Sequence, residues 1–290
     1  VNTVLPVFAD ISIELSGNGY NSDNTADVDY DTSTTVVQSN TADITNKVNA
    51  SADTGNNSAD RNTGGDVSVS TGDATTGVGV SNSVNSNKAE VNGCCDVDAD
   101  VLISGNGDSS DNDADLDFSN SIAVFQDNTA KLKNDVDAHS ETGNNSADRN
   151  TGGSVSIQTG DAQTEVLISN EANANWARIG GQSDGSHVSL RILGNGYNSD
   201  NTIDLDLDRS LTLVQSNFAK LSNRVDASAQ TGNNTADRNT GGDVDIETGD
   251  AETGVGIDNW VNFNAADVNC GCILDVLAKI AGNGDSSDND

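Results

Sequence analysis

The feature that most constrains the fold of this chain is an internal repeat of about 88 residues. The tripeptide Gly-Asn-Gly recurs at spacings of 88, 89 and 88 residues, at Gly17, Gly105, Gly194 and Gly282. A longer block recurs almost unchanged in each copy, as TGNNSADRNTGGDVSVSTGDA from Thr54, TGNNSADRNTGGSVSIQTGDA from Thr142 and TGNNTADRNTGGDVDIETGDA from Thr231. Identity of this degree indicates one structural unit used three times in tandem.

The repeat divides the chain into five predicted segments. The three complete units span 17–104, 105–193 and 194–281. An N-terminal apolar tail with a first strand precedes them at 1–16, and residues 282–290 are the truncated start of a fourth unit. The strand before each Gly-Asn-Gly therefore occurs four times.

Within each unit the pattern is that of β-strands. Polar and apolar residues alternate with period two in several segments, among them 27–31, 66–70, 204–208 and 243–246. The intervening GNG, TGNN, NTGG and TGD stretches are turn sequences. We therefore predict an all-β chain of three tandem β-sandwich-like repeats. The alternative is one continuous β-solenoid, in which Asn and Thr at repeated positions form ladders.

Composition excludes several functional classes. The chain carries 46 acidic and 13 basic residues, a net charge of −33, which repels a nucleic-acid backbone. No apolar run approaches the roughly 18–20 residues of a membrane helix, so we expect no membrane insertion. Aromatic residues make up only 3% of the chain, so the core is thin. Stability must then come from neighbouring units, metal, disulfides or assembly.

The four cysteines favour disulfides in an extracellular protein. We also expect that environment because the chain starts at Val1 and contains no Met, as after processing or removal of a signal sequence. They form two clusters, Cys94-Cys95 and Cys270-x-Cys272, which do not have zinc-site spacing. If the units run in a line, the clusters are too far apart for a bond with a Cα separation of about 5.5 Å. We predict bonds between the clusters of neighbouring subunits, with local bonds or free thiols as the alternative.

No set of residues indicates catalysis. His139 and His187 occupy non-equivalent places in the units and have no evident partner, so we predict neither an enzyme nor a small-molecule substrate. The Asp-rich turns do offer oxygen ligands at alternate positions, as Ca²⁺ requires. The predicted calcium ligands are Asp108, Asp111, Asp113, Asp285 and Asp288, and the alternative is that these residues only form turns. We expect no other cofactor.

Two further motifs recur in the units. Asp60-Arg61, Asp148-Arg149 and Asp237-Arg238 repeat one pair, which we interpret as an internal brace of its turn rather than a ligand site. Sequons for N-glycosylation are predicted at Asn49, Asn56, Asn144 and Asn233, although such sequons arise readily in a chain rich in Asn and Thr.

The combination of GNG, TGNN, NTGG and TGDA with Asn/Thr-rich strands resembles the repetitive secreted surface proteins of prokaryotes that form adhesins, sheaths or fibres. This resemblance covers almost the whole chain, but it is one of style and composition and transfers no ligand site.

The functional prediction is a structural subunit of an extracellular filament or surface layer, whose partner is a second copy added head to tail. The apolar tail would add to the sheet edge of the next subunit, and the residues that carry this role are Val1, Val4, Leu5, Val7 and Phe8. In the alternative arrangement the tail folds back onto its own first unit. Alternative functions are a monomeric cell-surface adhesin stalk and, more remotely, a secreted polysaccharide-active enzyme on a β scaffold.

Overall fold

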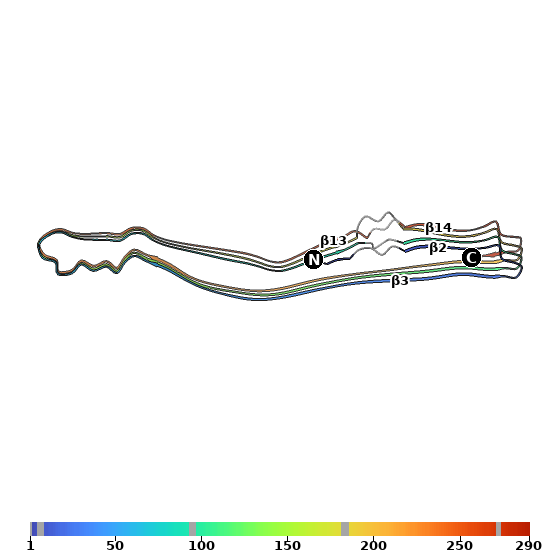
Figure 1. Ribbon diagram of the computed structural model, residues 1–290, viewed down its shortest axis with the longest axis horizontal. Coiled ribbons are helices and arrows are strands. Elements are labelled where there is room, and N and C mark those ends of the chain that lie inside the picture. Colours follow the sequence, from blue (N-terminus) through green and yellow to red (C-terminus); the bar gives the residue numbers. More distant parts are fainter. Residues whose placement is uncertain (1, 5–8, 93–96, 181–185, 271–273) are drawn as a thin grey trace.

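The computed structural model describes residues 2–4, 9–92, 97–180, 186–270 and 274–290. Every regular element in those ranges is a β-strand, and Figure 1 shows them in long, nearly superimposed layers. The strands are β1 (Asn2–Val4), β2 (Ala9–Ser16), β3 (Asp23–Asp53), β4 (Val67–Ser70), β5 (Ala74–Val91), β6 (Val97–Ser104), β7 (Asp111–Glu141), β8 (Val155–Gln158), β9 (Ala162–Ile179), β10 (Ser186–Leu193), β11 (Asp200–Gln230), β12 (Val244–Glu247), β13 (Ala251–Val268), β14 (Leu274–Ala281) and β15 (Asp288–Asn289).

The units stack on one another in parallel register. Residues that pair across neighbouring strands are 88 or 89 positions apart, as in Val36↔Val124 and Leu213↔Val124. We call each turn of the chain a rung, with rung 1 at 9–91, rung 2 at 97–179 and rung 3 at 186–268. The direction from rung 1 to rung 3 is called upward. β14 and β15 begin a fourth layer, and β1 pairs with the lower side of β5.

This arrangement confirms the all-β prediction and selects its alternative form, a solenoid. The tandem-sandwich arrangement is wrong because each strand finds its hydrogen-bond partners in the units above and below, as in the column β3-β7-β11. A unit has no sheet of its own, so its strands are paired only when units stack. The alternating segments from which strands were predicted lie in β3, β4, β11 and β12.

Each rung is a long, flat loop with two walls (Figure 1). In rung 1, β3 forms one wall along its 31 residues, while β2 and β5 lie on the opposite wall. The Gly-Asn-Gly turn closes one end of the loop, and the segment with TGNN and NTGG closes the other. Because the walls are long and the closing turns are short, side chains of the two walls contact each other along the length of the rung.

A single residue in the left-handed region shifts the alternation of the β5 wall. Asn85, Asn173 and Asn262 have φ angles of 58°, 63° and 62° in otherwise extended strands. Buried positions are even-numbered before Asn85 and odd-numbered after it, as in Val80 and Ala89. A bulge of this kind adds one residue and redirects the side chains that follow. Asn tolerates this conformation better than most residues, which explains its use in all three units.

The interior alternates apolar clusters with layers of amide and hydroxyl groups. Five separate clusters lie along the rung, centred in rung 2 on Leu116, Val124, Leu132, Val136 and Ile157. Between them lie buried polar side chains that are 0–1% exposed, in the order Gln126, Asn128, Asn134 and Ser140. Each apolar cluster is small within one rung, but it continues through the neighbouring rungs and is buried between them.

Candidate functional site: the two ends of the stack

Asparagine ladders run through the interior along the stacking axis. In one ladder the Nδ2 of Asn46 donates to Oδ1 of Asn134 at 2.8 Å, and Asn134 donates in the same way to Asn223 at 2.7 Å. The facing wall repeats the pattern from Asn82 to Asn170 at 2.7 Å. The two walls are also bonded to each other, because Asn134 donates to Asn170 at 3.0 Å. Each buried amide is therefore satisfied only when its neighbours above and below are in register.

These ladders all have the same polarity. The second pair of columns, which contains Asn40, Asn128 and Asn217, also donates from each rung to the rung above. So do the bulge residues, from Asn85 to Asn173 at 3.0 Å and onward to Asn262. The Gln column runs in the opposite direction, since Gln126 donates to Gln38. The upper and lower ends of the stack are consequently different and complementary surfaces.

The upper end exposes a cross-section of the core. Val255, Ile257 and Ile246 of rung 3 are 49%, 45% and 42% exposed, while the paired residues of rung 2, Val166, Ile168 and Ile157, are 0%, 2% and 0% exposed. The paired residues are identical, so the difference arises because rung 2 is covered by rung 3, whereas no described strand lies above these residues of rung 3. Exposed apolar surface of this kind marks an interaction site.

The ladder ends on the two faces match. On the upper face, Asn259 and Asn262 accept from rung 2 through Oδ1, and no bond from their Nδ2 groups occurs within the described ranges. On the lower face, Asn46 and Asn85 donate upward through Nδ2, and their Oδ1 atoms likewise have no partner in the described part of the chain. Unused donors thus face upward and unused acceptors face downward. Asn85 and Asn262 are the two ends of one column, whereas Asn46 and Asn259 end the facing columns of the two walls.

Two glycines mark how closely the layers approach. A Cβ on Gly143 would lie 1.7 Å from the carbonyl oxygen of Gly232, whereas a Cβ on Gly232 meets nothing within 4 Å. On the lower side, a Cβ on Gly160 would lie 2.6 Å from the carbonyl carbon of Gly72, and Gly72 again has open space. Gly232 and Gly72 have this space because, within the described residues, no rung lies above the first or below the second. We call these ends the upper face and the lower face.

The predicted calcium ligands are dispersed over the stack. Asp111 and Asp288 belong to one column of aligned acids with Asp23 and Asp200. Asp113 lies beside Thr25 and Thr202, while Asp108 and Asp285 lie in turns that a turn of rung 3 separates. Among the described residues no group of three or more acidic, His or Cys side chains is arranged to hold a metal. Calcium binding stays a prediction.

A denser acidic stripe lies on the outer face of the β3 wall, and the sequence analysis did not single it out. A shallow depression there is lined by carboxylates from all three rungs, at Asp27, Asp29, Asp115, Asp117, Asp204 and Asp206. Desolvation, followed by the charges of the carboxylates above and below, raises the pKa of Asp113, Asp115 and Asp117. The signal in the sequence was the repeated Asp-x-Asp alternation at one register position in each unit.

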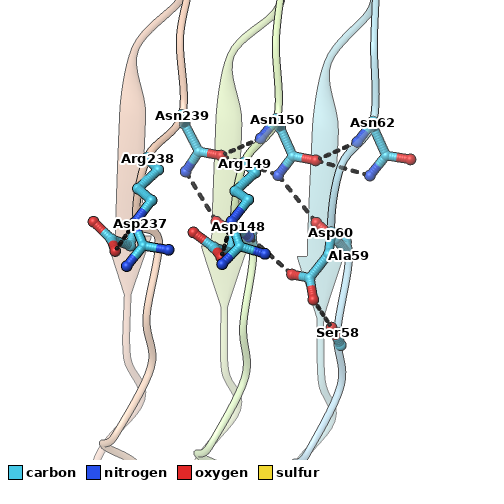
Figure 2. Close-up of polar contacts among 11 residues, drawn as sticks. Ser58, Ala59, Asp60, Asn62, Asp148, Arg149, Asn150, Asp237, Arg238 and Asn239 are labelled. Atoms are coloured by element: carbon cyan, nitrogen blue, oxygen red, sulfur yellow. Dashed lines mark hydrogen bonds and ion pairs between the residues drawn. The ribbon is translucent and has the colours of Figure 1, made fainter.

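The Asp-Arg pairs lie in the turn that closes one end of the rung, and Figure 2 shows the aspartates of the three pairs in successive rungs. The N–H of Asp148 donates to Oδ1 of Asp60 at 3.0 Å, and this bond, followed by one from Ser58, lowers the pKa of Asp60. The guanidinium of Arg149 lies 3.4 Å from its neighbour Asp148. Beside them Asn62, Asn150 and Asn239 form another upward ladder. These contacts are internal to the stacked turns, as expected for a brace.

Other predicted residues are placed as follows. Cys94, Cys95 and Cys272 lie outside the described residues, as do Val1, Leu5, Val7 and Phe8 of the tail. Cys270 is not a free thiol. The expectation of units in a line, with the two cysteine clusters far apart, is wrong because the units stack. The disulfide pairing between subunits stays a prediction.

The tail residue Val4 belongs to β1, which pairs with the β5 strand of its own unit. There it packs against the cluster that contains Val91. This is the alternative that the sequence analysis left open, and donation of the tail to a neighbour stays a prediction.

The sequons and histidines also have clear positions. Asn49 lies on the outer face of β3, and Asn56, Asn144 and Asn233 share one turn position with φ near 60° in every rung. Rungs are about 4.8 Å apart, so glycans on all three turn sequons would crowd one another. Nδ1 of His139 lies 2.6 Å from Ser228 Oγ. His187 Nδ1 lies 3.6 Å from a carboxylate oxygen of Asp275.

No family model, no curated protein and no solved structure matches the chain. Among the described residues there is no helix with the length and apolar character needed to cross a membrane.

Proposed function

We propose that this protein is a structural subunit of an extracellular filament, in which the upper face of one copy joins the lower face of the next. One observation carries the proposal. The upper face leaves core residues and ladder donors open, and the lower face leaves ladder acceptors open, with Asn262 and Asn85 at the two ends of one column. A second copy placed one rung above would bury Val255 and Ile257 and give Asn259 the partner that Asn170 has within the chain. The contact is heterologous, so it propagates without closing.

The two open glycines provide variants that separate assembly from folding. Gly232→Ala and Gly72→Ala place a methyl group in open space within one copy, and neither glycine has a positive φ angle. In the filament each methyl group would collide with backbone of the adjoining copy, as the equivalent contacts of Gly143 and Gly160 show. We expect each variant to fold and to remain monomeric in analytical ultracentrifugation and negative-stain microscopy.

A mixture of the two variants gives the sharper result. Gly232→Ala keeps an intact lower face and Gly72→Ala keeps an intact upper face, so mixing them should produce one-to-one dimers and nothing longer. Gly143→Ala is the matched control, because the same substitution within the stack should impair folding itself. Filaments formed by either variant alone would show that the faces do not join in register. Failure of the unsubstituted chain to assemble would contradict the function.

A further inference from the structure

We propose that β14 is an exchangeable cap on the upper face, which β2 of an incoming copy displaces when two copies join. This inference rests on the filament proposed above and specifies how its junction forms. It concerns the part of the upper face that β14 covers, next to the turn and β15 that continue the fourth layer.

The register requires a competition at this position. β2, β6, β10 and β14 are successive members of one column, and β14 pairs with β10 from Ser186↔Leu274 to Leu193↔Ala281. A second copy stacked in register places its β3 above β11 of the first. Its β2, in the same rung, then needs the place above β10 that β14 occupies. Both strands cannot lie there, so one of them must leave.

The incoming strand fills the core better than the resident one. Registers through the column align the inward-facing side chains Ile11, Ile13 and Leu15 of β2 with Val276, Ala278 and Ile280 of β14. The exchange replaces Val by Ile, Ala by Ile and Ile by Leu, a gain of four apolar carbons against the same neighbours. The backbone pairing and the ladder turn that follows are equivalent in the two segments. Apolar burial therefore favours displacement of β14.

A smaller segment must also leave the lower face of the incoming copy. β1 lies below Ala89–Val91 of its own chain. In the joined stack this position belongs to Ala266–Val268 of the other copy, since both segments pair with Ala177–Ile179 in equivalent registers. β1 has only three residues, so its release is the lesser step.

The test compares three full-length variants in elongation from preformed unsubstituted seeds, followed by light scattering. Ile280→Ser weakens the cap and should speed elongation at least about fivefold, because it removes apolar carbons that hold β14 in place. Ala278→Leu gives β14 the same side chain as Leu190, its partner in β10, and adds apolar contact that holds the cap in place. It should slow elongation by a similar factor. Leu277→Ser, on the outward side of the same strand, should leave the rate unchanged.

Amide hydrogen exchange gives a second readout. Residues 275–281 should be protected in the free copy and lose protection in filaments, while residues 10–16 stay protected. Equal elongation rates in all variants, slower growth of Ile280→Ser, or protected β14 amides in filaments would each overturn the cap. If the unsubstituted chain forms no filaments, the proposed function fails and the cap fails with it.

Discussion

At the scale of single residues, asparagine determines the register of this fold. The clusters of Val and Ile would tolerate a shift of two residues in the register between rungs, because apolar contacts have no direction. A buried Asn does not, since a shift opposes its amide to an apolar side chain and leaves donors unpaired. Asn134 illustrates the point, because it accepts from Asn46 and Asn82 and donates to Asn170 and Asn223.

Replacing one ladder amide by a carboxylate should have effects that depend on the rung. Asn134→Asp removes two donated bonds and places oxygen against the Oδ1 atoms of Asn170 and Asn223. We expect a loss of at least about 3 kcal/mol in the free energy of unfolding, measured by urea denaturation. Within the described residues Asn259 makes its side-chain hydrogen bonds through Oδ1, so Asn259→Asp should change stability by less than about 1 kcal/mol. Equal losses in the two variants would show that the ladder direction has no energetic meaning.

At the scale of strands, the charges of neighbouring rungs decide the stability of the outer face. Asp115 stands between Asp27 and Asp204, whereas Asp135 stands between Lys47 and Arg224 in the same wall. Both aspartates lie on the outer side of one strand, where Asp115 is exposed and Asp135 is half-buried. The charges about 4.8 Å above and below them have opposite signs.

The acidic stripe should make the fold more stable as the pH falls toward 4. The pKa values of Asp113, Asp115 and Asp117 are raised above 3.8 in the fold, so the folded chain binds more protons than the unfolded chain in that range. Their contribution is therefore lost as the pH rises through the raised pKa values. Asp60, with its lowered pKa, acts in the opposite direction. Thermal unfolding at a series of pH values measures the net effect.

A pair of substitutions isolates the stripe from other carboxylates. Asp115→Asn should raise the midpoint of thermal unfolding at pH 7 and flatten its rise on acidification. Asp135→Asn should lower the midpoint or leave it unchanged, because its neighbours are cations. A stabilising effect of the same size in both variants would point to general charge reduction instead of column repulsion.

The sequence predicts the strands better than it predicts their length. Alternation in 27–31 and 204–208 correctly indicated strands, but β3 continues through Ser, Thr and Asn residues that elsewhere favour turns. Those residues remain extended because each pairs with a residue of the next rung, and some, such as Asn40 and Thr41, pair with the same residue type. Strand formation here depends on stacking partners 88 residues away, which local propensity does not contain. The αL bulge at Asn85 is likewise invisible without the register.

At the scale of the whole molecule, the repeat was evident from the sequence and its spatial meaning was not. Three separate sandwiches and three stacked rungs require the same alternation and the same turn residues. What distinguishes them is the partner of each strand, and the signal of stacking was the Asn and Thr residues at repeated positions, such as Asn40, Asn128 and Asn217. Stacked rungs have an upper and a lower face with open strand edges, whereas in separate sandwich domains each strand would pair within its own unit.

Assembly of so acidic a chain should depend on ionic strength. Each copy carries a net charge of −33, and joining two copies brings their acidic stripes into line. Salt screens such repulsion, with a Debye length near 8 Å at about 0.15 M. We expect the concentration needed for filament growth to fall as NaCl rises, measured by sedimentation. Growth that weakens with salt would contradict end-to-end joining driven by apolar burial.

The calcium prediction can be checked in the same assay. Calcium and magnesium are compared at equal ionic strength, with chelator as the control. A specific effect of calcium on growth or on the melting temperature supports bound metal, and identical behaviour of the two ions removes it.

The orientation of the backbone bonds determines how such a fibre would respond to pulling. Ladder hydrogen bonds of all strands in a rung point along the stacking axis, so an axial load falls on every bond of the rung at once. Shared loading gives high stiffness and little extension before rupture. Within a copy the covalent backbone also links successive rungs, whereas no backbone crosses the junction between copies. Fracture should therefore occur cleanly at the junctions, and broken pieces should measure whole numbers of subunits.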